Sequence, residues 1–432
     1  MKNTAAQELI DFIHKSPSTF HVINNIIQEL VNEGFEPLFL TDEWKLKQGK
    51  KYFTTRNDSS IFAFITGTGE PENEGFKIIS AHSDSPTFKL KPSPEMTVEN
   101  HFIKLNTEVY GGPILMSWMD RPLSIAGRVS LQGNHPLCPI NRLINFDRPT
   151  VIIPNLAIHL NRSVNDGIAL NKQKDMLPLI GIETKEKFSK NLINKMIAQE
   201  LKVNESEILD FDLTLYEYQS GCIMGANNEF VSSPKLDNLA SVHAGLKALL
   251  RATPGKATQM LAIFDNEEVG SVTKQGAGSP IFSNIFERIL LNMGKSGEAF
   301  YRTIYKSFMI SADMAHSIHP NLTEKHDPVL HPVINGGPVI KIHANQKYTT
   351  DGESGAVFES ICREAGVPCQ KFVNRSDMEG GSTLGNVSTG KLEIRCVDVG
   401  NPILGMHSVR ELGGVEDHEY MTKAMTLFYN IN

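Results

Sequence analysis

The chain has little of what marks an exported, membrane-bound or nucleic-acid-binding protein. Its 432 residues include only five cysteines and no CxxC pair, which argues against a disulfide framework and against a cysteine-bound zinc. No apolar run approaches the ~20 residues that a membrane span needs, and the N-terminal segment has no signal-peptide core. We therefore expect a cytoplasmic protein that has no membrane partner.

Charge of one sign is not in large excess either. Lys and Arg number 42 and Asp and Glu 49, so a net charge of -7 gives no general attraction for nucleic acid, and we expect no such partner. The contents of 40% hydrophobic and 21% charged residues are ordinary for a globular protein. At roughly 100 to 200 residues per domain, the length favours two or three domains.

Several common catalytic motifs are missing. The sequence contains no HExxH and no GxSxG, which argues against a one-zinc thermolysin-like site and a nucleophile elbow. The glycine-rich segment 67–75 lacks the P-loop lysine and carries three acids that would repel phosphate. Ser382 and Thr383, in GGSTLG, are better explained as a glycine-rich turn near a cleft than as a nucleophile loop.

The chain does contain short apolar runs alternating with amphipathic segments of helical length. Strands are predicted at 61–66, 77–81, 259–264, 308–312, 338–342 and 392–398. Helices are predicted twice within 3–35 and at 236–252, 281–293 and 355–365. This alternation favours an α/β fold whose sheet is covered by helices on both faces.

The middle of the chain has a different pattern. Residues 91–232 carry strand-like segments such as TVIIPNLAIHLNR between Gly, Pro and Asn turns, with one helix near 185–200. We interpret this segment as a β-rich domain inserted into an α/β catalytic domain that comprises 1–90 and 233–432.

Histidine and acidic side chains follow several of the predicted strands. Ligands of open α/β sheets bind at the carboxyl ends of the strands, so these residues are expected to converge. The candidates are His82 and Asp84, the segment Asp265-Asn266-Glu267-Glu268, Asp313 with His316 and His319, and His407; Asp237 begins a helix.

Such a set suits a metal-dependent hydrolase. Imidazole and carboxylate ligands without thiolates suit Zn²⁺, Mn²⁺ or Co²⁺, and a shared carboxylate holds two ions ~3.5 to 4 Å apart. If Glu267 and Glu268 are extended, their side chains diverge, so one can bind metal while the other acts as general base. Asp84 is expected on the same side of the chain as His82 and can accept its second ring proton.

Six segments in this order resemble the aspartyl aminopeptidase family of two-zinc exopeptidases. They are SAHSDSPTFKLKP, SSPKLDNLAS, IFDNEEVGS, ISADMAHSIHPN, PVIKIHANQKY and GNPILGMHSVREL. The resemblance extends from about residue 10 to residue 430. It implies a zinc-exopeptidase-like α/β domain and an inserted β-rich domain that mediates dimer contacts, with dimers assembling into a homo-dodecamer.

The resemblance also implies roles for individual residues. Two Zn²⁺ ions per subunit would be held by His82, Asp237, Glu268, Asp313 and His407. In that scheme Asp237 bridges the ions, Glu267 is the general base and Asp84 supports His82. The implied reaction is hydrolysis of the first peptide bond of a peptide by a two-metal hydroxide mechanism, after which Glu267 passes the proton to the leaving amine.

Four further residues match substrate contacts of the family. His159 resembles a histidine delivered from a neighbouring subunit, and His316 and Tyr348 resemble residues near the substrate. Lys341 matches a lysine associated with an acidic N-terminal side chain, although an alternating strand would expose it to solvent without a role. Family members differ in their preference for acidic or neutral N-terminal residues, so Lys341 alone does not decide the substrate.

Two other functions fit the same residues. One is a different di-metal amide hydrolase that acts on acylated amino acids or dipeptides. The other is a binding protein that keeps the aminopeptidase fold and has lost activity. The second is disfavoured because all seven metal and catalytic positions carry the expected residue types.

Overall fold

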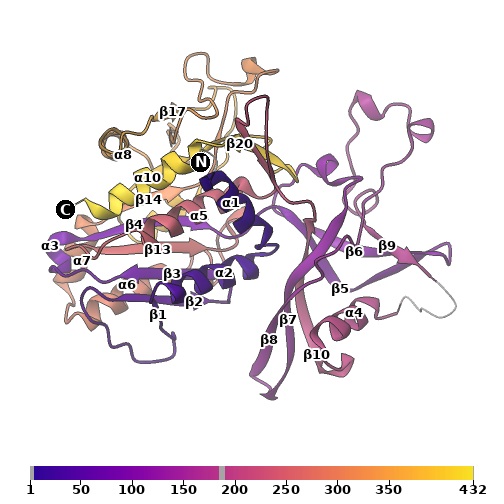
Figure 1. Cartoon of the computed structure of the whole chain (residues 1–432), viewed down its shortest axis with the longest axis horizontal. Helices are drawn as coiled ribbons and strands as arrows, with labels where there is room; N and C mark the ends of the chain where they lie inside the picture. Colours follow the sequence, from indigo (N-terminus) through magenta and orange to yellow (C-terminus); the bar gives the residue numbers. More distant parts are fainter. Residues whose placement is uncertain (1–3, 184–189, 432) are drawn as a thin grey trace.

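The computed structural model describes residues 4–183 and 190–431, which form two lobes (Figure 1). The larger lobe contains a nine-stranded sheet and a five-stranded sheet, and the smaller lobe contains a six-stranded sheet. In the described part of the chain, no helix combines the length and apolarity needed to cross a membrane.

Four parallel strands form the centre of the nine-stranded sheet. In spatial order they are β13 (Thr258–Phe264), β4 (Phe76–His82), β14 (Phe308–Ala312) and β18 (Arg395–Gly400). Every residue of β13 and β14 is buried, as expected for parallel strands that are covered on both faces. One edge continues through β3 (Ser60–Ile65), β2 (Lys51–Arg56) and β1 (Glu36–Pro37), and the other through β16 (Val339–Lys341) and β17 (Gln370–Phe372).

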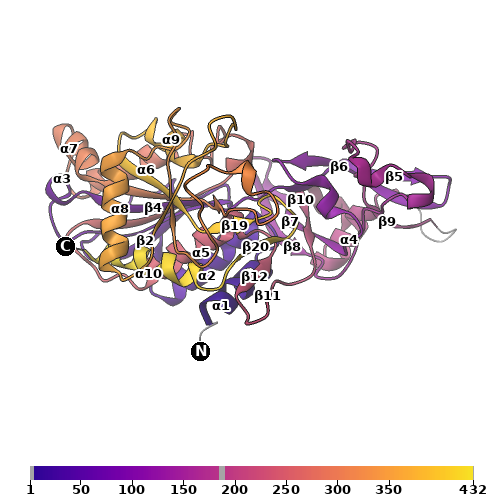
Figure 2. The same cartoon turned by 90° about the horizontal axis from the view of Figure 1, so that it is seen from above.

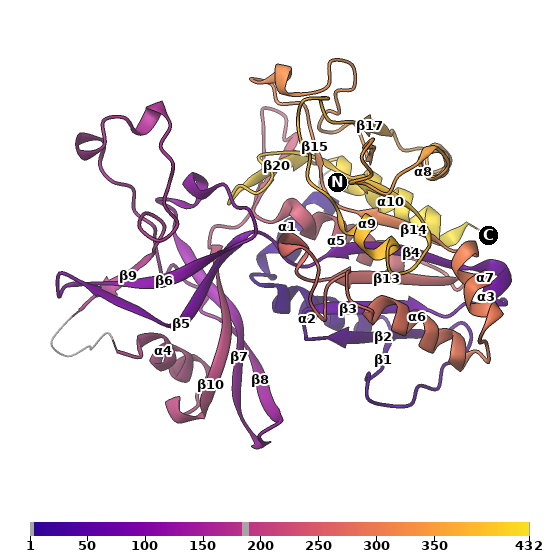
Figure 3. The same ribbon diagram turned by 180° about the vertical axis from the view of Figure 1, so that it is seen from behind.

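Helices cover both faces of this sheet, which confirms the predicted α/β fold (Figures 2 and 3). One apolar core is shared with α1 (Thr4–His14), α2 (Thr19–Asn32), α5 (Leu236–Leu250), α8 (Gly352–Glu364) and α10 (Asp417–Asn430). The core on the opposite face is shared with α6 (Ile281–Asn292), α7 (Glu298–Lys306) and α9 (Leu384–Thr389). The short α3 (Pro71–Glu74) lies beside α7.

The smaller lobe is built on an antiparallel sheet with its own apolar core. Its strands, in spatial order, are β8 (Cys138–Asn145), β7 (Leu123–His135), β10 (Ile208–Glu217), β5 (Thr87–Val98), β6 (Phe102–Tyr110) and β9 (Leu179–Ile182). Helix α4 (Leu192–Leu201) contributes Ile193 and Ile197 to that core. The predicted helix near 185–200 is thus found from 192 onward, and residues 184–189 lie outside the described part.

A third, five-stranded sheet joins distant parts of the chain near the lobe boundary. It comprises β11 (Cys222–Met224), β12 (Phe230–Ser233), β20 (Glu411–Gly414), β19 (Pro402–Leu404) and β15 (Ala315–His316). The six-stranded sheet therefore spans 87–217, whereas β12 pairs with the C-terminal strand β20 and β11 pairs with β12. The division of the chain into domains at residues 91 and 232 stays a prediction.

The segment TVIIPNLAIHLNR was predicted as a strand and is not one. Residues 151–153 make only isolated bridges, and Ile158–Leu160 form a 3-10 turn. Pro154 follows the bridges directly and cannot donate a backbone hydrogen bond, so a strand cannot continue through it as a regular ladder. His159 consequently lies on an exposed turn.

Candidate active site

The candidate residues converge where the central parallel strands end. His82 is the last residue of β4, Asp313 directly follows β14, and Glu267 and Glu268 follow β13 in the 3-10 turn Glu267–Val269. Asp237 comes from the first turn of α5. These residues line one cavity of about 460 Å³ together with His407, which follows β19.

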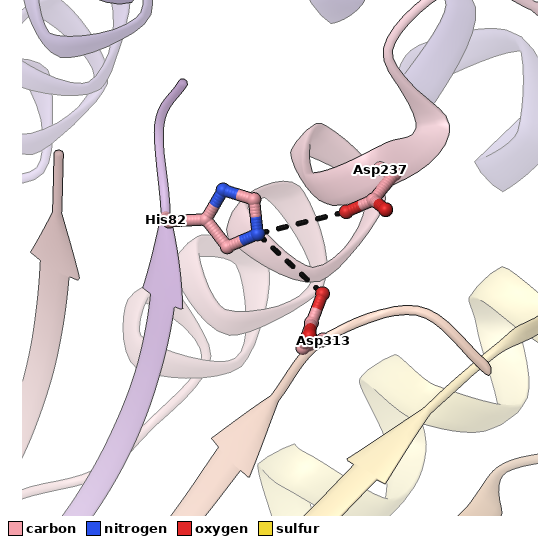
Figure 4. A group of neighbouring side chains, drawn as sticks. All are labelled: His82, Asp237 and Asp313. Atoms are coloured by element: carbon pink, nitrogen blue, oxygen red, sulfur yellow. Dashed lines mark ion pairs between the residues drawn. The ribbon is translucent and has the colours of Figure 1, made fainter. Parts of the chain in front are cut away.

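Two groups of metal-ligand atoms share Asp237. His82 Nε2 lies 3.6 Å from Asp237 Oδ1 and 3.4 Å from Asp313 Oδ1 (Figure 4). His407 Nε2 lies 3.6 Å from Asp237 Oδ2 and 3.5 Å from Glu268 Oε2. In each group the three ligand atoms lie within 4.8 Å of one another, close enough to hold one ion. Each carboxylate oxygen of Asp237 therefore faces a different group.

The electrostatics of the cavity favour bound cations. Burial and neighbouring carboxylates raise the pKa of Asp237 and of Glu268 well above their usual values, and raise that of Glu267 to about 7. Asp237 Oδ1 is buried and has no hydrogen-bond partner among the described residues. Divalent cations would supply both the charge compensation and the missing partner, and the imidazole and carboxylate donors fit such ions.

Asp84 lies behind His82 and organises two parts of the site. Its backbone carbonyl accepts a hydrogen bond from His82 Nδ1 at 3.1 Å, and its Oδ1 lies 3.4 Å from the same nitrogen, on the side of the ring away from the metal-ligand groups. Its carboxylate also accepts the backbone N–H groups of Glu267 at 3.2 Å and Glu268 at 3.1 Å, and the Tyr110 hydroxyl at 2.7 Å. Asp84 thus orients the imidazole through its carbonyl and carboxylate, and the glutamate turn through its carboxylate.

The expectation that Glu267 and Glu268 are extended was wrong. They lie in a 3-10 turn that follows Asn266, whose backbone is left-handed with φ 61. Because the carboxylate of Asp84 accepts two successive N–H groups, it stabilises a tight turn instead of a strand. Both glutamate side chains line the cavity in this conformation.

Lys341 is buried in the cavity wall. The alternative interpretation, in which an alternating strand exposes Lys341 to solvent, is therefore wrong. Its side chain is 3% exposed because β16 lies between β18 and β17 inside the sheet. Its Nζ donates to Asp313 Oδ2 at 3.2 Å and to the Met314 carbonyl at 3.1 Å, and lies 5.2 Å from the ring centroid of Tyr348. Burial acts to lower the pKa of Lys341, but Asp313, Tyr348 and Asp398 together outweigh burial and the pKa is raised. Lys341 is therefore a charged partner of Asp313.

The remaining candidates divide into those at the cavity and those elsewhere. His316 and Tyr348 line it beside Phe372, whose ring centroid is 5.7 Å from that of His316. Ser382 and Thr383 also line it, as the glycine-rich turn near a cleft predicted. His159 and His319 are not among the lining residues: His159 is on its exposed turn, and the backbone of His319 donates to His326.

Three residues of the site were not identified from the sequence. Tyr110 donates to Asp84, and Asp398 accepts from Thr383 Oγ1 at 2.8 Å and from the Thr349 N–H at 2.6 Å. Glu411 accepts two backbone N–H groups beside the cavity. For Asp398 and Glu411, the only signal available in the sequence was an acid in an otherwise apolar or glycine-rich strand, as in VRELGG around Glu411.

Comparisons with known proteins agree with one another over nearly the whole chain. The family described as "Aminopeptidase I zinc metalloprotease (M18)" matches residues 12–429. A Clostridium acetobutylicum protein named "Probable M18 family aminopeptidase 2" is 55% identical over 434 residues, covering 100% of both chains. The cryo-EM structure of the Ape4 and Nbr1 complex matches with a TM-score of 0.94 and 36% identity, over 99% of this chain and 86% of that chain. The structure of the S. cerevisiae mApe1 dodecamer matches with a TM-score of 0.87 and 27% identity, over 99% and 96%.

Proposed function

Because this chain belongs to the M18 family of zinc aminopeptidases, we propose that the cavity at the ends of β4, β13 and β14 is a two-zinc aminopeptidase site. The family assignment confirms the resemblance seen in the six sequence segments, and the chain is a zinc-dependent aminopeptidase. The observation that supports two ions is the carboxylate of Asp237, whose two oxygens face two separate ligand groups.

In this proposal the two ions share Asp237 and otherwise have separate ligands. His82, Asp237 and Asp313 hold one ion, and Asp237, Glu268 and His407 hold the other. Bound zinc supplies Lewis acidity for the scissile carbonyl and acidifies coordinated water at neutral pH. Mn²⁺ and Co²⁺ satisfy the same ligand types.

Glu267 is the general base in this proposal. It lines the cavity, and burial together with nearby carboxylates raises its pKa to about 7, close to the pH at which a base works best. It takes a proton from the attacking water and delivers it to the leaving amine. Asp84 holds the backbone of Glu267 and the ring of His82, which fixes the base relative to the metal ligands.

We also propose that the site accepts an acidic N-terminal residue. Lys341 has three N–H donors, of which Asp313 and the Met314 carbonyl use two. The third is available for a substrate carboxylate in the cavity that His316 and Tyr348 also line. Asp313 already compensates much of the charge on Lys341, which limits how strongly the site can prefer an acidic residue over a neutral one.

The proposed assembly is a homo-dodecamer built from dimers. A relative at 27% identity has been solved as a dodecamer, and the smaller lobe here exposes apolar side chains around His159. Leu156, Ile158 and Leu160 are 55%, 47% and 75% exposed, and neighbouring exposed apolar side chains of this kind are typical of contact surfaces. In the assembly, His159 is proposed to enter the active site of a neighbouring subunit.

A cytoplasmic location is part of the proposal. All five cysteines are free thiols, and Cys362 and Cys396 are buried. Unpaired cysteines are typical of proteins that work in a reducing compartment.

The function is tested with a panel of peptides and metals. The protein is stripped of metal, reloaded with zinc, manganese or cobalt, and assayed on peptides that begin with Asp, Glu, Leu, Ala or Lys. We expect metal to restore release of the first residue, with Asp and Glu released fastest. Equal cleavage of Leu peptides would remove the acidic preference and leave the aminopeptidase intact.

The alternative hydrolase is separated by one further substrate pair. An aminoacyl anilide with a free amine is compared with its N-acetylated form. Cleavage of only the free amine supports the aminopeptidase. Preferential cleavage of the acetylated form would instead support an amide hydrolase that acts on acylated amino acids.

A further inference from the structure

We propose that Glu411 is a positioning residue that sets the affinity of one of the two metal sites, the one formed by Asp237, Glu268 and His407. This inference rests on the proposed two-zinc site. Glu411 is the first residue of β20 and is 3% exposed. It reaches both neighbouring ligands through their backbones and lies outside the set of residues that line the cavity.

The carboxylate of Glu411 joins two ligands from distant parts of the chain. Its Oε2 accepts the Asp237 N–H at 2.9 Å, and its Oε1 accepts the His407 N–H at 2.8 Å. Strand pairing brings these segments together, because Glu411 pairs with Ser233, shortly before Asp237. His407 is in the turn that leads into β20. One side chain therefore fixes the distance between the starting points of two ligand side chains.

Both ligands occupy backbone conformations that need such support. Asp237 is non-helical inside the first turn of α5, with φ -83 and ψ 104, so the regular helix does not determine its position. The backbone of His407 has φ 67, in the left-handed region that residues other than glycine rarely adopt. Without the carboxylate of Glu411, the buried N–H of Asp237 and the part-buried N–H of His407 would lose their acceptor, and the left-handed turn would lose a bond that stabilises it.

Glu411 acts more strongly on one metal group than on the other, because the remaining ligands of the other group have different partners. His82 is oriented by Asp84, and Asp313 is bonded to Lys341. Asp237 belongs to both groups, but the second contact of Glu411 is to His407, which belongs to only one. A change at Glu411 should therefore weaken the two metal sites unequally.

Asp417 provides a matched control within the same chain. It is 1% exposed, and its two carboxylate oxygens accept the backbone N–H groups of Asn335 at 2.7 Å and Gly337 at 2.9 Å. Its arrangement therefore resembles that of Glu411, except that neither partner is a metal ligand. Glu411→Gln and Asp417→Asn each replace one carboxyl oxygen by an amide nitrogen, so that one of the two backbone N–H groups loses its acceptor.

The experiment compares zinc affinities of the metal-free full-length wild type, Glu411→Gln and Asp417→Asn, by competition with a chromophoric chelator. We expect the wild type to bind two ions per subunit. In Glu411→Gln one affinity should fall ~10- to 100-fold, a usual effect of losing a group that orients metal ligands, and the other should fall much less. Asp417→Asn should lower thermal stability and leave both affinities unchanged. The visible absorption of bound Co²⁺ should change in Glu411→Gln only.

Two results overturn the inference and are distinct from failure of the proposed function. The first is a Glu411→Gln protein with both wild-type affinities and a wild-type Co²⁺ spectrum. The second is an equal loss of affinity in Asp417→Asn, which would make the effect one of general stability. A wild type that binds fewer than two ions would overturn the two-zinc proposal itself. If Glu411→Gln does not fold, the same criteria apply to Glu411→Asp. That variant keeps the carboxyl group, but its side chain is too short to reach both N–H groups.

Discussion

Replacing Lys341 by methionine should destabilise the metal-free protein far more than the zinc-loaded protein. The buried ammonium of Lys341 lies 3.2 Å from Asp313 Oδ2, and Lys341 and His82 together hold the pKa of Asp313 below its usual value, although burial acts to raise it. Removing one partner of a buried ion pair leaves an uncompensated charge and costs ~3 to 5 kcal/mol. Zinc bound at Asp313 would compensate that charge, so most of the loss should disappear on loading.

The assay is thermal unfolding of metal-free and zinc-loaded protein. At ~2 to 4 °C per kcal/mol for a large domain, the metal-free Lys341→Met protein should unfold roughly 6 to 20 °C below the wild type. Lys371→Met on the adjacent strand is the control, because Lys371 is 47% exposed and its ion pair with Glu359 is expected to contribute at most ~1 kcal/mol. An equal loss with and without zinc, or no loss in either state, would refute the reasoning.

Three other changes test separate parts of the mechanism and fold. Glu267→Gln should bind both metals and unfold at the wild-type temperature. Its turnover at saturating substrate should fall ~100- to 10,000-fold because the general base is lost, and near-normal turnover would exclude that role. A variant held as a monomer should fold but hydrolyse peptides poorly, since His159 would be missing from each site, and a fully active monomer would contradict this. Burial lowers the pKa of His418 to about 4, and that of its hydrogen-bonded neighbour His243 well below the usual value. The unfolded chain therefore binds protons first as the pH falls below 6.5, and His418 alone should cost on the order of 3 kcal/mol of stability by pH 4. Thermal unfolding of metal-free protein between pH 6.5 and 4 should accordingly show a shallower pH dependence in His418→Gln than in the wild type, and identical slopes would show that this pair does not contribute.

The central sheet was predictable because parallel strands covered on both faces are continuous apolar runs. Residues 259–264 and 308–312 were predicted as strands and are found as β13 and β14. The site followed from the same pattern, since His82 and Asp313 stand where such strands end. A one-dimensional pattern is sufficient here because the sheet itself brings the carboxyl ends of parallel strands together.

Features that depend on partners distant in the chain could not be predicted in this way. Lys341 was open to a solvent-exposed interpretation, and only the placement of β16 between two strands shows that it is buried beside Asp313. The 3-10 turn of Glu267 depends on a carboxylate 183 residues away in the sequence. Glu411 contacts Asp237 across a separation of 174 residues. Such hydrogen bonds leave no periodic signal in the sequence.

The most direct test of the two-zinc site is the zinc content of the wild type and Asp237→Ala after dialysis against metal-free buffer. Each oxygen of Asp237 faces a different ligand group, so its loss should impair both sites. We expect two zinc ions per subunit in the wild type, and less than one, together with loss of peptide hydrolysis, in folded Asp237→Ala. One zinc ion in a fully active wild type, or two retained by the variant, would contradict the account.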